Sequence, residues 1–207
     1  IFVRSYYDSD GDGVGDFKGI EMKLDYIKEL GANALWLMPI NTSETYHGYD
    51  IEDYYDVNED FGTMEDFKSL LGAAHEKGIR IVMDLVINHS SSENEWFKKS
   101  AKRIAPYDDW YIWRTDLPDK NWGEKDSRRY RSKRRLWQFN ETRQEYYFRY
   151  FSRTMPDLNY SGSVGLREEI YKVAEFWLDL GVDGFRLDAI EHLFENEEFE
   201  DDDPASV

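Results

Sequence analysis

Gly184-Phe185-Arg186-Leu187-Asp188-Ala189 is a short apolar run that carries one cation and one carboxylate two residues apart. Side chains alternate between the two faces of a strand, so Arg186 and Asp188 share one face while Phe185 and Leu187 share the other. Packing alone does not require an Arg and an Asp on one face of a buried strand. A structural ion pair at the strand end is one interpretation, and a functional site is the other.

One order of elements occurs three times along the chain, the last time ending in this run. Each time, apolar residues at helical spacing are followed by a glycine and then by an apolar strand. The helices are expected over 20–30, 64–77 and 166–180, the glycines are Gly31, Gly78 and Gly181, and the strands are expected over 34–39, 79–84 and 184–189. Such units are typical of parallel strands joined by right-handed crossovers.

Two further local signals extend this pattern. Residues 1–7 are rich in β-branched and aromatic side chains and predict a strand ahead of the first helix. Thr63 and Asp66 stand three residues apart at the start of the second helix, which predicts a capping box.

Polar residues follow each of the four predicted strands. The strands lead into an Asp-rich loop at 8–16, into 41–50, into 84–89 and into Asp188. Polar groups at the C-terminal ends of all strands are typical of a (β/α)8 barrel, whose sites are assembled from successive βα loops. A doubly wound sheet is the alternative, but no glycine-rich phosphate fingerprint follows the first strand. We therefore predict an α/β fold that comprises the first four β/α units of a TIM-type barrel.

The alternation of helix and strand stops between Asn88 and about Tyr160. About seventy residues without it are too many for a simple loop, so we predict an irregular domain inserted after the third strand. Five of the seven Trp lie in it, at Trp96, Trp110, Trp113, Trp122 and Trp137. The predicted parts are 1–88 (barrel, strands 1–3), 89–160 (inserted domain) and 161–207 (barrel continuation).

The acidic loop 8–16 has carboxylates at alternate positions, which would repel one another unless a cation lay among them. Hard oxygen ligands of this kind suit Ca²⁺ or, less well, Mg²⁺. The loop opens like an EF-hand, but position twelve is Gly19 rather than Glu and the predicted strand, not a helix, precedes it. An acidic turn without metal is the alternative. The predicted ligands are the side chains of Asp8, Asp10, Asp12 and Asp16 and the main-chain carbonyl of Val14.

Composition excludes several classes of protein. The 207 residues are 41% hydrophobic, which is enough to bury a core, but no apolar run approaches the ~20 residues that span a bilayer. There is no Cys, so a disulfide framework, a thiol nucleophile and a thiolate metal site are all excluded.

The net charge of −17 is unevenly distributed. Residues 98–153 hold 16 of the 26 Lys and Arg against 8 Asp and Glu, a local charge of +8, and the rest of the chain is strongly acidic. An acidic body argues against nucleic acid as the main partner, because phosphate binding needs a cationic face. We interpret the most basic segment, 128–135, as a solvated loop or a domain contact.

Four motifs, in this order along the chain, resemble the α-amylase family of glycoside hydrolases, whose members are (β/α)8 barrels with a domain inserted after the third strand. The motifs are Tyr-His-Gly-Tyr-Asp at 46–50, Asp-Leu-Val-Ile-Asn-His-Ser at 84–90, Met-Pro-Asp-Leu-Asn at 155–159, and 184–192. The resemblance covers nearly the whole chain. The acidic loop also resembles the calcium loop that follows the first strand in many members.

The resemblance implies a role for each matching residue. Asp188 would be the nucleophile that forms a covalent glycosyl-enzyme on the retaining route, and Arg186 would keep it ionised and aimed. Tyr49 would stack on the sugar ring, His89 would hydrogen-bond a sugar hydroxyl, and Asp84 would brace the substrate site.

His192 is also implied as a substrate-binding position. In addition, Asn88 and the main chain near His192 match positions that help to bind a second calcium in many α-amylases. The sequence does not identify the ligands that the inserted domain would add.

Details within the motifs bear on the substrate. Exo-acting α-glucosidases usually have Asp-Asn before the Gly-Tyr pair, whereas this chain has Tyr46-His47, as endo-acting α-amylases do. Met155 and Glu191-His192 favour the same group. The resemblance thus implies hydrolysis of internal α-1,4 bonds in starch-like glucans or maltooligosaccharides. The alternatives are an oligo-1,6-glucosidase, a neopullulanase-like or trehalose-forming enzyme, or a non-catalytic relative that binds carbohydrate or a partner.

Retaining hydrolysis needs a second carboxyl group, about 5 to 5.5 Å from the nucleophile, to protonate the leaving oxygen. In the family this Glu lies after the fifth strand, which we do not expect within these residues. We expect the chain to need the missing C-terminal half of the barrel as its partner and to have no appreciable activity alone. Polymeric substrates suggest secretion or the cell envelope, with a cytoplasmic location as the alternative. Because the chain starts at Ile1, any targeting peptide is expected to be absent from it.

Overall fold

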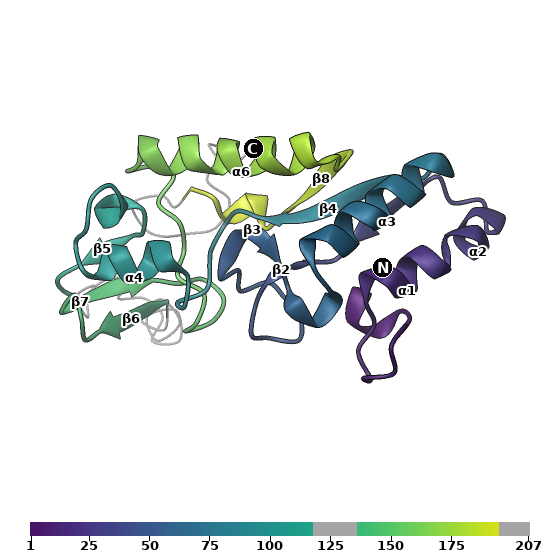
Figure 1. Ribbon diagram of the computed structural model, residues 1–207. Coiled ribbons are helices and arrows are strands. Elements are labelled where there is room, and N and C mark those ends of the chain that lie inside the picture. The colour runs from purple at the N-terminus through teal and green to yellow at the C-terminus, as the bar shows by residue number, and fades with distance from the viewer. Residues whose placement is uncertain (118–135, 195–207) are drawn as a thin grey trace, which may run out of the picture. The chain divides into compact units, whose positions relative to one another are not determined.

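The computed structural model describes residues 1–117 and 136–194 (Figure 1). The basic segment 128–135 and Trp122 lie outside these described residues. The chain forms two compact units, which are Ile1–Val86 with Ile170–Asp188, and Ile87–Glu169 with Ala189–Val207.

The first unit is built on a parallel sheet in the order β1-β4-β8 (Figure 1). Trp36 of β1 pairs with Val82 of β4, and Asp84 of β4 pairs with Arg186 of β8. Paired residues of parallel strands lie on the same face, so Trp36, Asp84 and Arg186 share one face of the sheet. The strands are β1 (Ala34–Leu37), β4 (Arg80–Val86) and β8 (Gly184–Asp188).

The predicted helices are present, with one break. The helix expected over 20–30 is two short helices that meet at Lys23. The predicted capping box of the next helix is confirmed, because Thr63 Oγ1 accepts from the Asp66 amide and Asp66 Oδ2 accepts from the Thr63 amide. The three predicted glycines follow their helices with positive φ angles. The helices are α1 (Phe17–Met22), α2 (Leu24–Glu29), α3 (Met64–Glu76) and α6 (Val164–Leu180).

Apolar side chains cover the other face of the sheet. Ile81 and Met83 of β4 are fully buried, as is Phe67 on the apolar face of α3. Trp177 of α6 is also fully buried, its ring packs edge-on against Phe67, and its indole N–H donates to the Tyr54 carbonyl at 2.8 Å. These contacts bury this face at β4, and the polar side chains of Asp84 and Arg186 lie on the opposite face.

The strand predicted over 1–7 is wrong, because Val3–Ser5 form a 3-10 helix, η1. The carbonyls of Arg4 and Tyr7 accept from the amides of the acidic loop, at 2.7 and 3.1 Å, so they are not available for strand pairing. Only Ile1 lies along the sheet, where its carbonyl accepts from the Met38 amide at 2.9 Å. Within the described residues the parallel sheet therefore has three strands instead of the predicted four.

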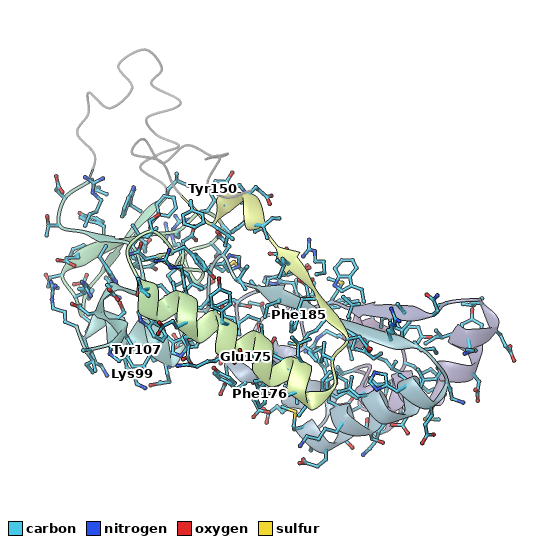
Figure 2. The ribbon with its side chains drawn as sticks, turned by 90° about the horizontal axis from the view of Figure 1, so that it is seen from above. Lys99, Tyr107, Tyr150, Glu175, Phe176 and Phe185 are labelled. Carbon is cyan, nitrogen blue, oxygen red and sulfur yellow. The ribbon has the colours of Figure 1, made fainter. Side chains whose placement is uncertain are left out.

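A short antiparallel hairpin follows β1 and was not predicted. It pairs β2 (Asn41–Thr42) with β3 (Asp53–Val57), and η2 (Glu59–Phe61) comes directly after it. The side chain of Phe176 on α6, labelled in Figure 2, packs edge-on against Tyr55 of β3 with ring centroids 5.2 Å apart. The hairpin therefore fixes both ends of the segment that carries Tyr49.

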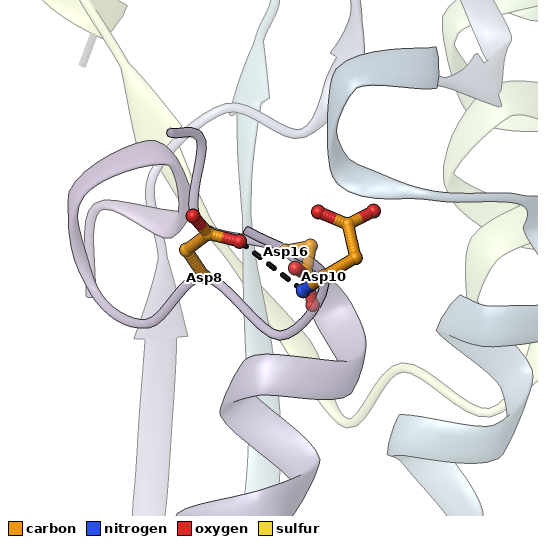
Figure 3. Close-up of side chains that lie close together, drawn as sticks. All are labelled: Asp8, Asp10 and Asp16. Atoms are coloured by element: carbon orange, nitrogen blue, oxygen red, sulfur yellow. Dashed lines mark hydrogen bonds between the residues drawn. The ribbon is translucent and has the colours of Figure 1, made fainter. Parts of the chain in front are cut away.

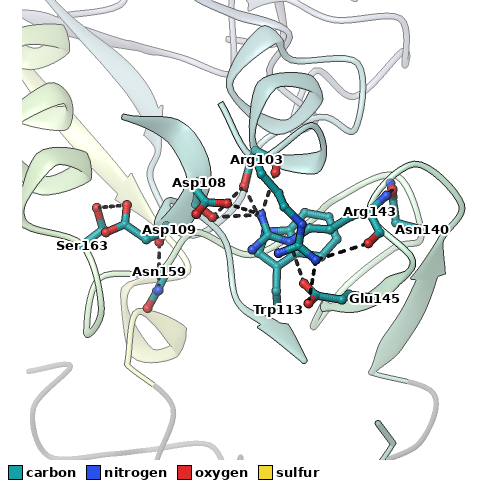
Figure 4. Close-up of polar contacts among 10 residues, drawn as sticks. Arg103, Asp108, Asp109, Trp113, Asn140, Arg143, Glu145, Asn159 and Ser163 are labelled. Atoms are coloured by element: carbon teal, nitrogen blue, oxygen red, sulfur yellow. Dashed lines mark hydrogen bonds and ion pairs between the residues drawn. The ribbon is translucent and has the colours of Figure 1, made fainter. Parts of the chain in front are cut away.

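The second unit contains an antiparallel sheet in the order β5-β7-β6. Arg143 holds it to the preceding segments: its guanidinium donates to Asp108 at 2.7 Å and to Glu145 at 2.6 Å and lies 4.6 Å from the Trp113 ring (Figure 4). The elements are α4 (Glu95–Ala101), η3 (Tyr107–Asp109), β5 (Trp113–Arg114), β6 (Trp137–Asn140), β7 (Glu145–Phe148) and η4 (Ile190–His192).

No helix among the described residues is both long enough and apolar enough to cross a membrane.

Candidate active site

Asp84, Arg186 and Asp188 form one cluster at the C-terminal end of β4 and β8. Arg186 Nη1 donates to Asp188 Oδ1 at 2.5 Å and to the two carboxylate oxygens of Asp84 at 3.1 and 3.2 Å. The expectation that Arg186 and Asp188 point the same way is met, because β8 is a regular strand over both. Parallel pairing of β4 with β8 then brings Asp84 opposite Arg186.

Burial differs across this cluster and sets its charges. The Asp84 side chain is 0% exposed, against 16% for Asp188 and 41% for Arg186. Burial raises the pKa of Asp84, and the hydrogen bonds and charge of Arg186 oppose that rise. Burial also disfavours the Arg186 cation, but its contacts with both carboxylates outweigh this and raise the pKa of Arg186 above its ordinary value. The guanidinium therefore stays charged between the two acids.

Tyr49 adds a phenol to the same cluster. Its hydroxyl donates to Asp84 Oδ2 at 3.2 Å. Burial, followed by the charges of Asp84 and Asp188, raises the pKa of Tyr49 to about 12. The hydroxyl is therefore protonated at neutral pH and acts as a donor.

The backbone around Tyr49 explains its position. Gly48 has φ +79°, and a Cβ there would lie 3.1 Å from the Pro39 carbonyl oxygen, so only glycine fits without strain. The Tyr49 amide donates to Nδ1 of His47 at 3.1 Å. The Tyr-His-Gly-Tyr-Asp motif is thus a turn that presents Tyr49 to Asp84.

The remaining predicted substrate-binding residues, His89 and His192, belong to the second unit. His89 is buried, and its ring lies 5.1 Å from the Phe151 ring. His192 stacks on Tyr150 with centroids 4.0 Å apart. In the first unit the structure therefore brings together four of the predicted site residues, Tyr49, Asp84, Arg186 and Asp188.

Asp157 is a residue of interest to which the sequence assigned no role beyond its place in the Met-Pro-Asp-Leu-Asn motif. It is 1% exposed, and burial raises its pKa to about 7 against hydrogen bonds from the Tyr150 amide and the Asn88 side chain. Asn88 Oδ1 and Asp157 Oδ2 are both buried without a hydrogen-bond partner among the described residues. Two such oxygens fit a hard cation, and the acid within the Met-Pro-Asp-Leu-Asn motif was the available signal.

The acidic loop brings three of its four predicted carboxylate ligands together. Carboxylate oxygens of Asp8, Asp10 and Asp16 lie within 4.8 Å of one another (Figure 3), whereas that of Asp12 is not in this group. The main-chain carbonyl of Val14 stays a prediction. Asp12 instead accepts from the Val14 amide at 2.7 Å.

Loop amides and a helix end hold these carboxylates. Hydrogen bonds from the Gly11 and Gly13 amides lower the pKa of Asp8. Asp16 caps α1 by accepting from the Gly19 amide at 2.6 Å, and it also accepts from the Ser9 amide at 2.8 Å. The oxygen-only ligand set fits Ca²⁺.

Comparison with known proteins decides the family. A family model described as alpha amylase, catalytic domain, matches residues 1–206. The chain belongs to the α-amylase family. The cluster of Tyr49, Asp84, Arg186 and Asp188 therefore lies within the residues that match this family.

Among sequence relatives, this α-amylase-family chain is 50% identical over 198 residues to "Alpha-amylase 3" of Dictyoglomus thermophilum, covering 95% of this chain and 37% of that protein. It is 46% identical over 208 residues to an oligo-1,6-glucosidase of Parageobacillus thermoglucosidasius, covering 100% of this chain and 36% of that protein. The chain thus spans just over a third of the length of these relatives.

Solved structures agree with the family assignment. The α-amylase from H. orenii matches with a TM-score of 0.81 at 46% identity, covering 94% of this chain and 40% of that one. Trehalose-6-phosphate hydrolase from Bacillus licheniformis matches with a TM-score of 0.84 at 40% identity, covering 98% and 36%. The neighbours are TIM-barrel enzymes of the α-amylase family, so the predicted partial barrel is confirmed.

Proposed function

We propose that this chain carries the nucleophile of a retaining glycoside hydrolase that cleaves internal α-1,4 bonds of starch-like glucans. The observation that supports this most is the position of Asp188, whose Oδ1 accepts from Arg186 at 2.5 Å. That bond orients the carboxylate and leaves Oδ2 to attack the anomeric carbon. The bond to the leaving sugar oxygen then breaks, and a covalent glycosyl-enzyme forms on Asp188.

The surrounding residues prepare this attack. Arg186 Nη1 donates to Asp188 Oδ1 and so orients this carboxylate. Asp84, fully buried, accepts from the same guanidinium nitrogen, Nη1. Tyr49, kept protonated, offers its ring to the sugar and its hydroxyl to Asp84.

A second carboxyl group must protonate the leaving oxygen. No carboxylate other than Asp84 and Asp188 binds Arg186 among the described residues, and Asp84 is fully buried. We therefore place the general acid in another part of the complete enzyme, whose relatives are nearly three times as long as this chain.

The preference for internal bonds rests on Tyr46 and His47. Neither is a carboxylate that could bind the terminal hydroxyls of a glucan, and Tyr46 is exposed. An oligo-1,6-glucosidase is the second candidate, favoured by the 46% identity to that enzyme of Parageobacillus thermoglucosidasius.

Two substrates separate these candidates in the complete enzyme. A maltooligosaccharide blocked at its non-reducing end is cleaved only by an endo-acting enzyme, whereas isomaltose is cleaved only by an enzyme that accepts α-1,6 bonds. We expect turnover of the blocked substrate and none of isomaltose. The opposite result would reassign the enzyme to the oligo-1,6-glucosidase group.

We also propose that Asp8, Asp10 and Asp16 bind Ca²⁺, and that the same loop binds Mg²⁺ more weakly. A second calcium at Asn88, with Asp157 and the main chain near His192, is proposed on the buried oxygens of Asn88 and Asp157. Calorimetric titration of the chain should show Ca²⁺ binding that Asp8→Asn weakens and Glu59→Gln, outside both sites, does not. Equal binding by all three proteins would refute the loop site.

A further inference from the structure

Trp36 contacts the cluster from β1, on the same face of the sheet. The Arg186 guanidinium carbon lies 5.2 Å from the centre of the Trp36 ring. Trp36 belongs to β1, and Arg186 belongs to β8, two strands away across β4. Val82 of β4 pairs with Trp36 on one side and with Gly184 of β8 on the other. Beside Trp36, the same face of the sheet therefore carries only the Val82 side chain and a glycine. This leaves room for the guanidinium to reach the ring.

The hydrogen bonds alone do not fix the guanidinium. All three bonds to Asp84 and Asp188 come from the single nitrogen Nη1. A planar group held through one nitrogen can still turn about it, and turning points the N–H bonds of Nη1 away from at least one carboxylate. Contact with an aromatic face restrains the plane, and Trp offers the strongest face for a cation.

We propose that Trp36 is a positioning residue for the nucleophile. By holding the plane of Arg186, the ring keeps Nη1 between Asp84 and Asp188 and so keeps the Asp188 carboxylate aimed. This inference rests on the proposed function, in which Asp188 is the nucleophile. Trp36 itself needs no contact with the sugar for this role.

The test compares Trp36→Leu and Trp36→Phe in the complete enzyme. Loss of a cation–π contact should lower kcat about 3- to 30-fold in the Leu variant, with KM nearly unchanged. Phe keeps a weaker aromatic face, so the fall in kcat should be smaller in the Phe variant. Tyr171→Leu, which removes an exposed aromatic ring of α6, is the matched control and should leave kcat unchanged.

A pH profile separates positioning from simple packing. The charged and titratable groups that face Arg186 are Asp84 of β4, Asp188 of β8 and the Tyr49 hydroxyl beside them. A misplaced guanidinium opposes the burial-driven rise of the Asp84 pKa less, so the Leu variant should lose activity at a higher pH on the acid side than the parent enzyme. A packing defect would lower kcat without this shift.

An NMR measurement tests the contact without activity. The Arg186 side-chain N–H resonance should carry an upfield ring-current shift that disappears in Trp36→Leu. Asp188→Asn in the same enzyme tests the proposed nucleophile separately. The inference on Trp36 is overturned if the Leu variant keeps both kcat and its acid limb, or if the Leu and Phe variants lose activity equally with unchanged acid limbs.

Discussion

At the scale of single residues, the cluster of Asp84, Arg186 and Asp188 depends on one guanidinium nitrogen. The alternation of side chains along a strand was enough to predict that Arg186 and Asp188 share a face. The contact of Arg186 with Trp36 was not predictable, because it depends on which strand lies two positions away in the sheet. A sequence pattern gives the face of a residue, but not its neighbours across strands.

Replacing Arg186 with Lys keeps the charge but removes the planar group. A lysine ammonium has enough N–H donors for Asp84 and Asp188, but it lacks the rigid planar group that lies over Trp36 and fixes the direction of those donors. We expect kcat of the complete enzyme to fall by about 10² or more, as when an orienting hydrogen-bond donor is removed. Steady-state kinetics would measure it, with Arg80→Lys on the exposed start of β4 as the control. An Arg186→Lys enzyme with parental kcat would contradict the role given to the guanidinium.

At the scale of elements, short local signals were reliable where they were self-contained. The capping box of α3 needs only Thr63 and Asp66, and it formed as predicted. The strand over 1–7 failed because the carbonyls of Arg4 and Tyr7 bind the acidic loop, a competition that strand propensity does not include. The hairpin of β2 and β3 was missed because a strand of two residues has too little pattern to detect.

A contact between Asp183 and His75 ties three elements together. Asp183 Oδ2 accepts from His75 Nε2 of α3 and from the Ile81 amide of β4, both at 2.8 Å. Partial burial opposes ionisation, but these hydrogen bonds outweigh it and lower the pKa of Asp183. A lowered pKa means that this carboxylate stabilises the fold above its unfolded pKa of about 3.9 and that the stability is lost as pH falls below it.

Asp183→Asn should therefore reduce the free energy of unfolding at neutral pH by about 1 to 2 kcal/mol, at the low end for hydrogen bonds to charged groups because both side chains are partly exposed. The difference from the parent should shrink below about pH 3, where both proteins lack the charge. Urea unfolding at the two pH values measures this. Asp25→Asn, which removes an exposed partner of Lys77, should cost less than about 0.5 kcal/mol and serves as the control. A difference from the parent that does not depend on pH would contradict the assignment.

At the scale of the whole molecule, the barrel-type order of units was predictable from the repeated helix-glycine-strand pattern. Polar residues after each predicted strand indicated that the site lies at the C-terminal ends of the strands. The structure places Tyr49, Asp84, Arg186 and Asp188 together there. Asp157 was missed as a site residue because its burial comes from the packing of the second unit and not from its own motif.

The chain of 207 residues should show no measurable turnover of maltooligosaccharides by itself. The cluster supplies a nucleophile, but retaining hydrolysis also needs a general acid, which we place elsewhere in the complete enzyme. The check is a sensitive reducing-sugar assay on the purified chain, with the complete enzyme as the positive control. Turnover at the level of the complete enzyme would show that the general acid lies within these residues.

The central claim is that Asp188 forms the covalent bond to the sugar. A fluorinated glucosyl fluoride that slows hydrolysis of the intermediate should trap it in the complete enzyme, and peptide mass spectrometry would locate the adduct. We predict one glucosyl adduct on the peptide that contains Asp188, absent in Asp188→Asn. An adduct on any other residue, or products of inverted configuration with no adduct, would contradict the account.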